Sequence, residues 1–365
     1  MMKYLWMLFV FSMIWWWGTS GSIASAIPSS VEAINVMDLG AKCDGKTMDT
    51  DAFLRGIAIV SSVGGELSVP ASDRSRPCLF NSTLVLNKVR LIGHNSVLKF
   101  VGSHSIAIRL IAPVPMYSAW TGIEGPLLLL NGGQDNKGLV VGPAFNAQVR
   151  GTQIEGFEVG IYTHASYGPI VGFRMEGFHL NNKVNVDWEA GAENIVFENG
   201  FFDHLKGEVS TSRWMGGKTG EGGPGYISDF QFWGTSWDGD VPTFINCSAS
   251  VHGGHFEPTA SGGTYFATIG DGVSRAALAL FGTSLGVMPA YSFPQNTFFR
   301  VRRQSRMDAL GVRVCSVLHP GPPAVSEPFR LMVLEPGASG NSTDLFTHNC
   351  ADYPSPQGEI LRESN

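Results

Sequence analysis

The chain has 365 residues, of which 25 are Lys or Arg and 31 are Asp or Glu, so its formal net charge is −6. A weakly acidic chain without a clustered basic surface is not expected to bind nucleic acid, because phosphate contacts need a dense patch of cations. Hydrophobic residues make up 44% of the chain, and 45 glycines interrupt many short runs rich in Val, Ile and Phe. This composition indicates a large all-β fold.

The first 26 residues have the features of a secretory signal peptide. Lys3 supplies a positive charge, residues 5–17 form an apolar run, and Ala24-Ser25-Ala26 is a small-x-small cleavage site. The run is shorter than the roughly 20 residues that cross a bilayer, although an uncleaved anchor is the alternative. We therefore expect the mature chain from Ile27 to be secreted, into the extracellular space or the periplasm, and free of the membrane after cleavage.

Residues 27–78 are predicted to form an N-terminal cap region. Within VMDLGAKCDGKTMDTDAF, residues 36–53, the pair Asp44-Gly45 indicates a turn, and Asp49 or Thr50 can cap a following helix. Gly64-Gly65 would end that helix. The apolar spacing that predicts a helix over residues 48–63 is carried by Phe53, Ile57 and Val60.

Export makes disulfides feasible, and the chain has five cysteines. Cys43 with Cys78 and Cys315 with Cys350 are the expected pairs, because the members of each pair are close in sequence. Cys247 is left over and is expected to be buried in a strand.

The middle of the chain is repetitive. Three segments, GTQIEGFEVGIY from 151, GFRMEGFHLNNKVNV from 172 and NIVFENGFFDHLKGEV from 194, share an apolar residue, then Glu, then Gly and Phe. Periods of 21 and 22 residues in helix-poor, β-rich units indicate a solenoid, here a parallel β-helix over residues 79–335. A β-sandwich with coincidental similarity between strands is the alternative. Residues 336–365 are polar and are predicted to form a C-terminal tail.

The proposed repeat predicts which side chains stack on successive coils, at the strand spacing of about 4.8 Å. Two inward ladders are expected. One consists of Ile154, Met175 and Phe197, and the other consists of Phe157, Phe178 and Phe201.

The stretch from 34 to 100 contains the segments INVMDLGAKCDGKTMDTDAFLRGIA, GGELSVPAS and LVLNKVRLIGHNSVLKF. Together these segments resemble the start of the pectate-lyase-like β-helix superfamily. The resemblance implies a single-stranded right-handed parallel β-helix with an N-terminal capping helix, and work on glycans. The local motifs of the pectin hydrolases (Asn-Thr-Asp, Asp-Asp, Gly-His-Gly and Arg-Ile-Lys) do not occur in the sequence, so the resemblance transfers no active-site residues.

A row of glutamates is the first candidate site. If Glu155, Glu176 and Glu198 face outward on adjacent coils, their carboxyl groups would lie roughly 5 Å apart, which suits a retaining glycosidase pair. Crowded like charges would also raise the pKa of one of them. A cation such as calcium clamped by the row, or three solvated residues that splay apart, are the alternatives.

The second candidate lies in WGTSWDGD and VHGGHFEP. Trp233 and Trp237 could stack on sugars, and Asp238, His255 and Glu257 could bond hydroxyls or transfer protons. Core packing for the tryptophans and hydrogen bonding at a corner for the histidines are the alternatives. Metal binding is not predicted, because the helical frame of a typical zinc site is absent.

The third candidate follows at a coil end. Asp203 with His204 could supply a base, and His204 with Lys206 or Arg213 could neutralise the carboxylate of a uronate in a lyase. We therefore expect a secreted protein that cleaves a polysaccharide, pectin-like or another acidic glycan, by hydrolysis or β-elimination. A non-catalytic glycan-binding or surface-adhesion protein is the alternative. No cofactor is expected, and the protein is expected to be a monomer or a trimer.

Overall fold

The computed structural model describes residues 33–113, 121–205, 210–216, 228–257, 265–287, 297–316, 330–343 and 359–362. Residues 33–365 cluster as one compact unit, whereas residues 1–32, which hold the predicted signal peptide, lie outside the described residues. Within the described ranges, no helix is long and apolar enough to cross a membrane.

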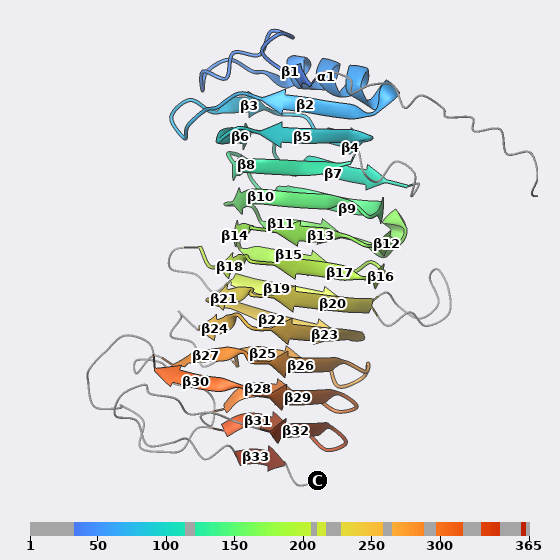
Figure 1. The fold of residues 1–365 in the computed structure, drawn as a ribbon, viewed down its shortest axis with the longest axis vertical. Helices are drawn as coiled ribbons and strands as arrows, with labels where there is room; N and C mark the ends of the chain where they lie inside the picture. Colours follow the sequence, from blue (N-terminus) through green and yellow to red (C-terminus); the bar gives the residue numbers. More distant parts are fainter. Residues whose placement is uncertain are drawn as a thin grey trace, which may run out of the picture. The chain divides into compact units, whose positions relative to one another are not determined.

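The strands of this unit stack as successive coils (Figure 1), and the strands of neighbouring coils pair in parallel. The described part of the chain forms a 20-stranded sheet and a 13-stranded sheet. The expected right-handed parallel β-helix with a helix near its N-terminus is therefore confirmed.

The 20-stranded sheet contains β1 (Ile34–Asn35), β2 (Gly65–Val69), β3 (Cys78–Phe80), β5 (Val89–Gly93), β6 (Ser96–Phe100), β8 (Gly122–Asn131), β10 (Gln148–Glu155), β13 (Arg174–Glu176), β14 (His179–Asn181), β17 (Ile195–Glu198), β18 (Phe201–Asp203), β20 (Ser228–Trp233), β21 (Ser236–Asp238), β23 (Cys247–His252), β24 (His255–Glu257), β26 (Ala277–Phe281), β27 (Ser284–Val287), β29 (Arg306–Leu310), β30 (Arg313–Ser316) and β32 (Ser339–Thr343).

The 13-stranded sheet contains β4 (Leu84–Asn87), β7 (Ile106–Ala112), β9 (Lys137–Phe145), β11 (Val159–Thr163), β12 (Ile170–Val171), β15 (Val184–Trp188), β16 (Ala192–Glu193), β19 (Ser210–Met215), β22 (Asp240–Ile245), β25 (Ala267–Ile269), β28 (Thr297–Val301), β31 (Arg330–Leu334) and β33 (Glu359–Arg362). Outside the two sheets, the described residues form two helical elements, α1 (Thr50–Val63) and the short 3₁₀ turn η2 (Ala165–Tyr167).

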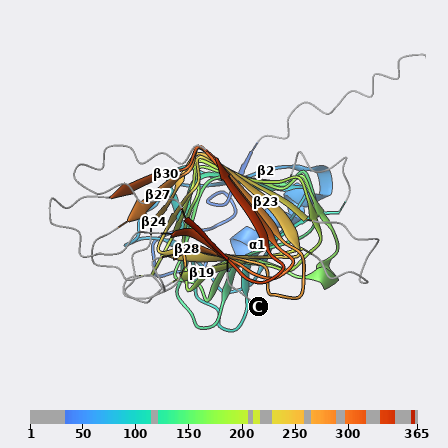
Figure 2. The same cartoon turned by 90° about the horizontal axis from the view of Figure 1, so that it is seen from below.

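A typical coil has three strands, such as β20, β21 and β22. Seen end-on, β23 and β24 lie on the two sides of an apex, and β19 and β28 lie along the base (Figure 2). The apex is a turn with one residue in the left-handed conformation, which glycine and asparagine adopt at low cost. That position is held on successive coils by Gly151, Gly177, Asn199, Gly234, Gly253, Gly282 and Gly311, with φ between 52° and 68°.

The interior is built from side chains that alternate inward along each strand and stack between coils. Met175 pairs with Phe197 and Phe197 with Phe232, and all three are fully buried. Beyond the apex, Phe202 stacks on Trp237 and Trp237 stacks on Phe256, with ring centroids 5.4 and 4.4 Å apart. An aromatic core therefore fills the middle coils.

The two predicted ladders are only partly correct. Met175 and Phe197 do pair, but Val149 takes the place that was expected for Ile154, which pairs with Leu180 beyond the apex. The second ladder does not form. Phe201 is 47% exposed, and its neighbour Phe202 faces the core.

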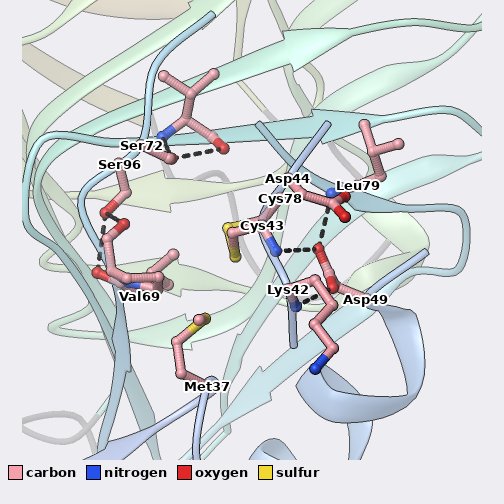
Figure 3. Close-up of a disulfide and its surroundings, with 12 residues drawn as sticks. Met37, Lys42, Cys43, Asp44, Asp49, Val69, Ser72, Cys78, Leu79 and Ser96 are labelled. Atoms are coloured by element: carbon pink, nitrogen blue, oxygen red, sulfur yellow. Dashed lines mark hydrogen bonds between the residues drawn. A yellow bond between two sulfur atoms is a disulfide. The ribbon is translucent and has the colours of Figure 1, made fainter. Parts of the chain in front are cut away.

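The cap helix α1 is confirmed over Thr50–Val63, and Gly64 follows it with φ 80°. Asp49 precedes the helix, but its side chain bonds no helical amide. The Asp49 carboxylate is 2% exposed and accepts the backbone N–H groups of Lys42, Cys43 and Leu79 at 2.6, 3.1 and 3.3 Å (Figure 3). Asp49 therefore joins the loop before the helix to β3, a role that the predicted helix cap did not include.

The expected turn at Asp44-Gly45 is present. Asp44 accepts the N–H groups of Lys46 and Thr47, and these hydrogen bonds lower the pKa of Asp44 to about 2. The predicted Cys43–Cys78 disulfide is confirmed, and it lies beside the Asp49 bonds (Figure 3). Cys247 is free and buried in β23, as expected. Cys350 lies outside the described residues, so its pairing with Cys315 stays a prediction.

Strand pairing continues past residue 335, where a tail was expected. β32 pairs with β29, and β33 pairs with β31. Parts of the segment 336–365 therefore belong to the coils, because their backbones extend both sheets.

Candidate functional site

The candidate site lies on the outward side of β14, β18, β21 and β24, just beyond the apex. Leu180, Phe202, Trp237 and Phe256 are buried at the centres of these short strands. Because alternate residues of a strand face opposite sides, the residues on either side of each buried one face outward. Asp238 pairs with Glu257 and Ser236 with His255 in the sheet register.

Asp238, His255 and Glu257 converge on one point. His255 Nε2 lies 2.9 Å from Asp238 Oδ1 and 3.6 Å from Glu257 Oε2. One ligand-type atom from each of the three residues lies within 4.8 Å of the other two. On the other side of the ring, His255 Nδ1 is 2.9 Å from the hydroxyl of Ser236, which fixes the orientation of the imidazole.

The surroundings of this cluster shift the pKa values of Glu257 and His255. Burial raises the pKa of Glu257, and the neighbouring Asp238 carboxylate raises it further, whereas His255 lowers it. The hydrogen bond to Asp238 raises the pKa of His255 against the effect of burial. Glu257 is therefore the group that retains a proton to higher pH than an ordinary glutamate.

Asp203, the third carboxyl group at this site, adjoins the first group together with two histidines. Asp203 lies 3.1 Å from His179 Nε2 and 3.0 Å from His204 Nδ1. His204 Nδ1 is also 3.1 Å from the backbone carbonyl of Asp238. Because a carbonyl only accepts, Nδ1 of His204 carries a proton. The six residues Asp203, His179, His204, Asp238, His255 and Glu257 are called the Asp–His cluster below.

The structure thus brings together Asp203, His204, Asp238, His255 and Glu257, which the sequence had placed in two separate candidates. His179 was missed. His179 directly precedes the buried Leu180, which indicates that the His179 side chain faces outward, and it pairs with Phe201 of the next coil. The pairing register was needed to place His179 near the other cluster residues.

The glutamate row does not form as predicted. Glu176 and Glu198 are paired on adjacent coils, but Glu155 pairs with Asn181 on the other side of the apex. Each glutamate has an arginine partner. Arg74 is 2.6 Å from Glu155, Arg150 is 3.3 Å from Glu176, and Arg174 bonds Glu198. These cations compensate the charges of the three glutamates.

The predicted sugar-stacking role of Trp237 is wrong, because its ring is 1% exposed and packed between Phe202 and Phe256. Trp233 is 43% exposed, but one ring face is covered by His252, whose centroid is 3.9 Å away with the planes at 7°. His252 in turn stacks on Phe281 at 4.8 Å. Trp233 therefore belongs to an outward column of stacked rings beside the Asp–His cluster.

Of the two predicted cations, Arg213 is not part of the cluster. Arg213 lies on β19 in the other sheet, where it bonds Asp187 at 2.7 Å and also Glu189. Lys206 lies outside the described residues. The Arg213 partners, together with Tyr162, form a polar group that the sequence reasoning missed. Burial raises the pKa of both Asp187 and Tyr162 there.

Comparisons with known proteins identify the fold. No family model matches the chain, and no curated protein matches its sequence. The A-module of the Azotobacter vinelandii mannuronan C-5 epimerase AlgE4 matches with a TM-score of 0.50 at 12% identity, over 90% of this chain and 100% of that one. The catalytic unit of a GH87 α-1,3-glucanase from Streptomyces thermodiastaticus strain HF3-3 matches with 0.41 at 14%, over 92% and 68%.

PfbA, a surface adhesin of Streptococcus pneumoniae, matches with a TM-score of 0.41 at 10% identity, over 86% of this chain and 90% of that one. At 12% identity the AlgE4 match establishes the class of fold alone, which is the right-handed parallel β-helix. Membership of the pectate-lyase-like superfamily stays a prediction.

Proposed function

We propose that the chain is a glycoside hydrolase that cleaves a polysaccharide at the Asp–His cluster. The observation that supports this most is the pair Asp238 and Glu257, which pair on neighbouring strands with carboxyl oxygens within 4.8 Å of each other. Retaining glycosidases hold their two carboxyl groups roughly 5–5.5 Å apart. The raised pKa of Glu257 supplies the protonated member of such a pair.

In this mechanism Glu257 donates its proton to the glycosidic oxygen as the bond from that oxygen to the anomeric carbon breaks. Asp238 attacks the same carbon and forms a covalent ester. Glu257, now ionised, then takes a proton from water, and the resulting hydroxide displaces Asp238. His255 orients the Asp238 carboxylate through the contact between Nε2 and Oδ1.

The composition of the cluster favours hydrolysis over β-elimination. Elimination from a uronate needs a cation beside the sugar carboxylate, whereas the described residues of the cluster are three carboxyl groups and three imidazoles, without a lysine or an arginine. A uronate would meet like charge at Asp203 and Asp238. We therefore propose an uncharged sugar at the cleavage point, in place of the acidic glycan that the sequence suggested.

The test is a panel of polysaccharides assayed for new reducing ends, with the anomeric form of the first product read by proton NMR. Retention of configuration and loss of activity in Glu257→Gln are expected. Glu176→Gln is the control, because it removes a carboxylate of the same sheet that pairs with Arg150. Absorbance of an unsaturated uronate, or cleavage that persists in Glu257→Gln, would contradict the proposal.

A non-catalytic glycan-binding or adhesion role is the second candidate, and the exposed column Trp233–His252–Phe281 favours it. Such a protein would release no reducing ends and would keep its glycan affinity when Asp238 and Glu257 are both changed to their amides.

Export through the signal peptide is part of either proposal. A mature N-terminus at Ile27, read by mass spectrometry, is the result expected.

A further inference from the structure

A recess opens on the outward side of the 20-stranded sheet, away from the Asp–His cluster. It lies where Gly122 stands between Arg90 and Gln148 in the sheet register. A Cβ on Gly122 would come within 2.2 Å of the Gln148 carbonyl oxygen, so no side chain fits at that place. The hollow at this place measures about 260 Å³ and is lined by Arg90, Thr121, Gly122, Ile123, Glu124, Gln148 and Arg150.

The lining groups are held in place by charge pairs. Arg90 lies 3.0 Å from Glu66 and 3.6 Å from Glu124, and Arg150 lies 3.3 Å from Glu176. Long side chains that are already fixed lose little entropy when a ligand binds. The recess therefore presents guanidinium donors, a carboxylate acceptor and an amide with both functions, in a nearly fixed arrangement.

We propose that this recess binds one uncharged sugar ring of a glycan chain. Each sugar hydroxyl both donates and accepts, so a wall with alternating donors and acceptors suits neighbouring hydroxyl groups. Glu66, Glu124 and Glu176 outnumber Arg90 and Arg150, so no net positive charge is left to select a uronate. The volume is below the roughly 300–1,000 Å³ of pockets for drug-sized ligands, so one ring fits and a longer segment does not.

The recess is separate from the proposed point of cleavage. Gln148 of β10 is followed along the sheet by the pairings with β13, β17 and β20, which correspond to roughly 14 Å along the axis at the usual strand spacing. The Asp–His cluster lies across the apex: its nearest member, His179, is one coil from β10, whereas Asp238 and Glu257 lie on β21 and β24, in the coils of β20 and β23. The recess is thus a binding site in its own right and does not depend on the proposed hydrolase activity.

The experiment measures the affinity of four neutral hexasaccharides (malto-, cello-, laminari- and mannohexaose) and of hexagalacturonate by calorimetry, using the whole mature chain in the Glu257→Gln background. At least one neutral hexasaccharide is expected to bind, and Arg150→Met is expected to weaken it about tenfold, the effect of losing a hydrogen bond to a charged group.

Two controls separate binding from structure. Arg306→Met removes an arginine that pairs with Asp308 elsewhere on the same sheet, and it is expected to leave the affinity unchanged. Glu176→Gln frees the Arg150 side chain but keeps the guanidinium, so it is expected to weaken binding less than Arg150→Met does. The proposal is overturned if no neutral hexasaccharide binds, if hexagalacturonate binds more tightly than all of them, or if Arg150→Met behaves like the controls. If the unchanged protein binds a neutral hexasaccharide but cleaves no polysaccharide of the panel, only the hydrolase proposal is overturned.

Discussion

Two aspartates in the short stretch Trp237-Asp238-Gly239-Asp240 have opposite environments. Asp238 faces outward in the Asp–His cluster, whereas Asp240 starts β22 and is 4% exposed. Asn185 donates a hydrogen bond to Asp240 Oδ1 at 3.2 Å. Burial raises the pKa of Asp240 to about 7, and the hydrogen bonds from Ser212 and Asn185 only partly offset it.

The raised pKa of Asp240 predicts a stability that falls with pH. Between about pH 4 and pH 7 the unfolded chain has lost this proton and the folded chain still holds it, so unfolding becomes easier as pH rises through this window. A difference of about three pKa units corresponds to roughly 4 kcal/mol. In Asp240→Asn this part of the slope should disappear. Urea unfolding at pH 4, 5.5 and 7 tests it, and equal slopes in both proteins would contradict it.

His255 of the Asp–His cluster provides a second prediction at this scale, and this prediction rests on the proposed hydrolysis. Glu257 must be protonated to act as an acid, so activity should fall as pH rises through its pKa. The positive charge of His255 lowers that pKa. His255→Gln should therefore move the alkaline limb of the kcat/KM profile to higher pH.

The control for this prediction is His252→Gln, because His252 stacks between Trp233 and Phe281 and is not part of the Asp–His cluster. Its alkaline limb should match that of the unchanged protein. A limb that stays in place, or moves to lower pH, in His255→Gln would show that Glu257 is not the titrating acid.

At the scale of elements, the corners explain both the success and the error of the repeat prediction. Ile154-Glu155-Gly156 and Met175-Glu176-Gly177 look alike because each ends at a left-handed glycine, with φ 82° and 60°. The two glycines serve different corners, since Gly177 follows β13 at the apex and Gly156 follows β10 after the apex. The same local sequence pattern therefore occurs at two different positions in the coil, and the repeat prediction treated them as one.

The fold and the cap could be predicted because they depend on local signals: apolar spacing in α1, the Asp-Gly turn, two cysteines close in sequence and glycines at corners. The candidate site could not be predicted from such local signals. Phe197 to Phe232 is one coil of 35 residues, and Phe232 to Val251 is one of 19. With such variable coils, the sequence does not determine which outward side chains become neighbours, and His179 and Asp203 meet only through the register.

The apex provides a prediction for backbone strain. Gly177 has φ 60°, and an added Cβ would meet nothing closer than 3.8 Å, so a substitution there tests conformation without a clash. Gly177→Ala should destabilise the fold by about 1–2 kcal/mol. Gly177→Asn should cost less, because Asn199 already occupies the same place in the next coil with φ 52°. Urea midpoints of the two variants test this, and equal losses would contradict it.

For the compact unit as a whole, stability is expected to vary along the stack. In a solenoid each coil contacts its neighbours alone, so a local change propagates weakly. The middle coils contain the buried Trp188, Trp214 and Trp237 with their phenylalanine neighbours. The first coils rely on α1, the Asp49 hydrogen bonds and the disulfide.

Replacing Cys43 and Cys78 by serine should therefore loosen the cap and leave the aromatic coils unchanged. The disulfide closes a loop with a sequence separation of 35 residues, for which the chain-entropy model gives roughly 3–4 kcal/mol. Hydrogen exchange should become faster in α1 and β3 of the variant, because these elements can open without the rest. In β20, β21, β23 and β24 the exchange should match that of the unchanged protein. A uniform increase across all coils would instead show that the unit opens as one cooperative body, and the Asp–His cluster would then depend on the cap for its order.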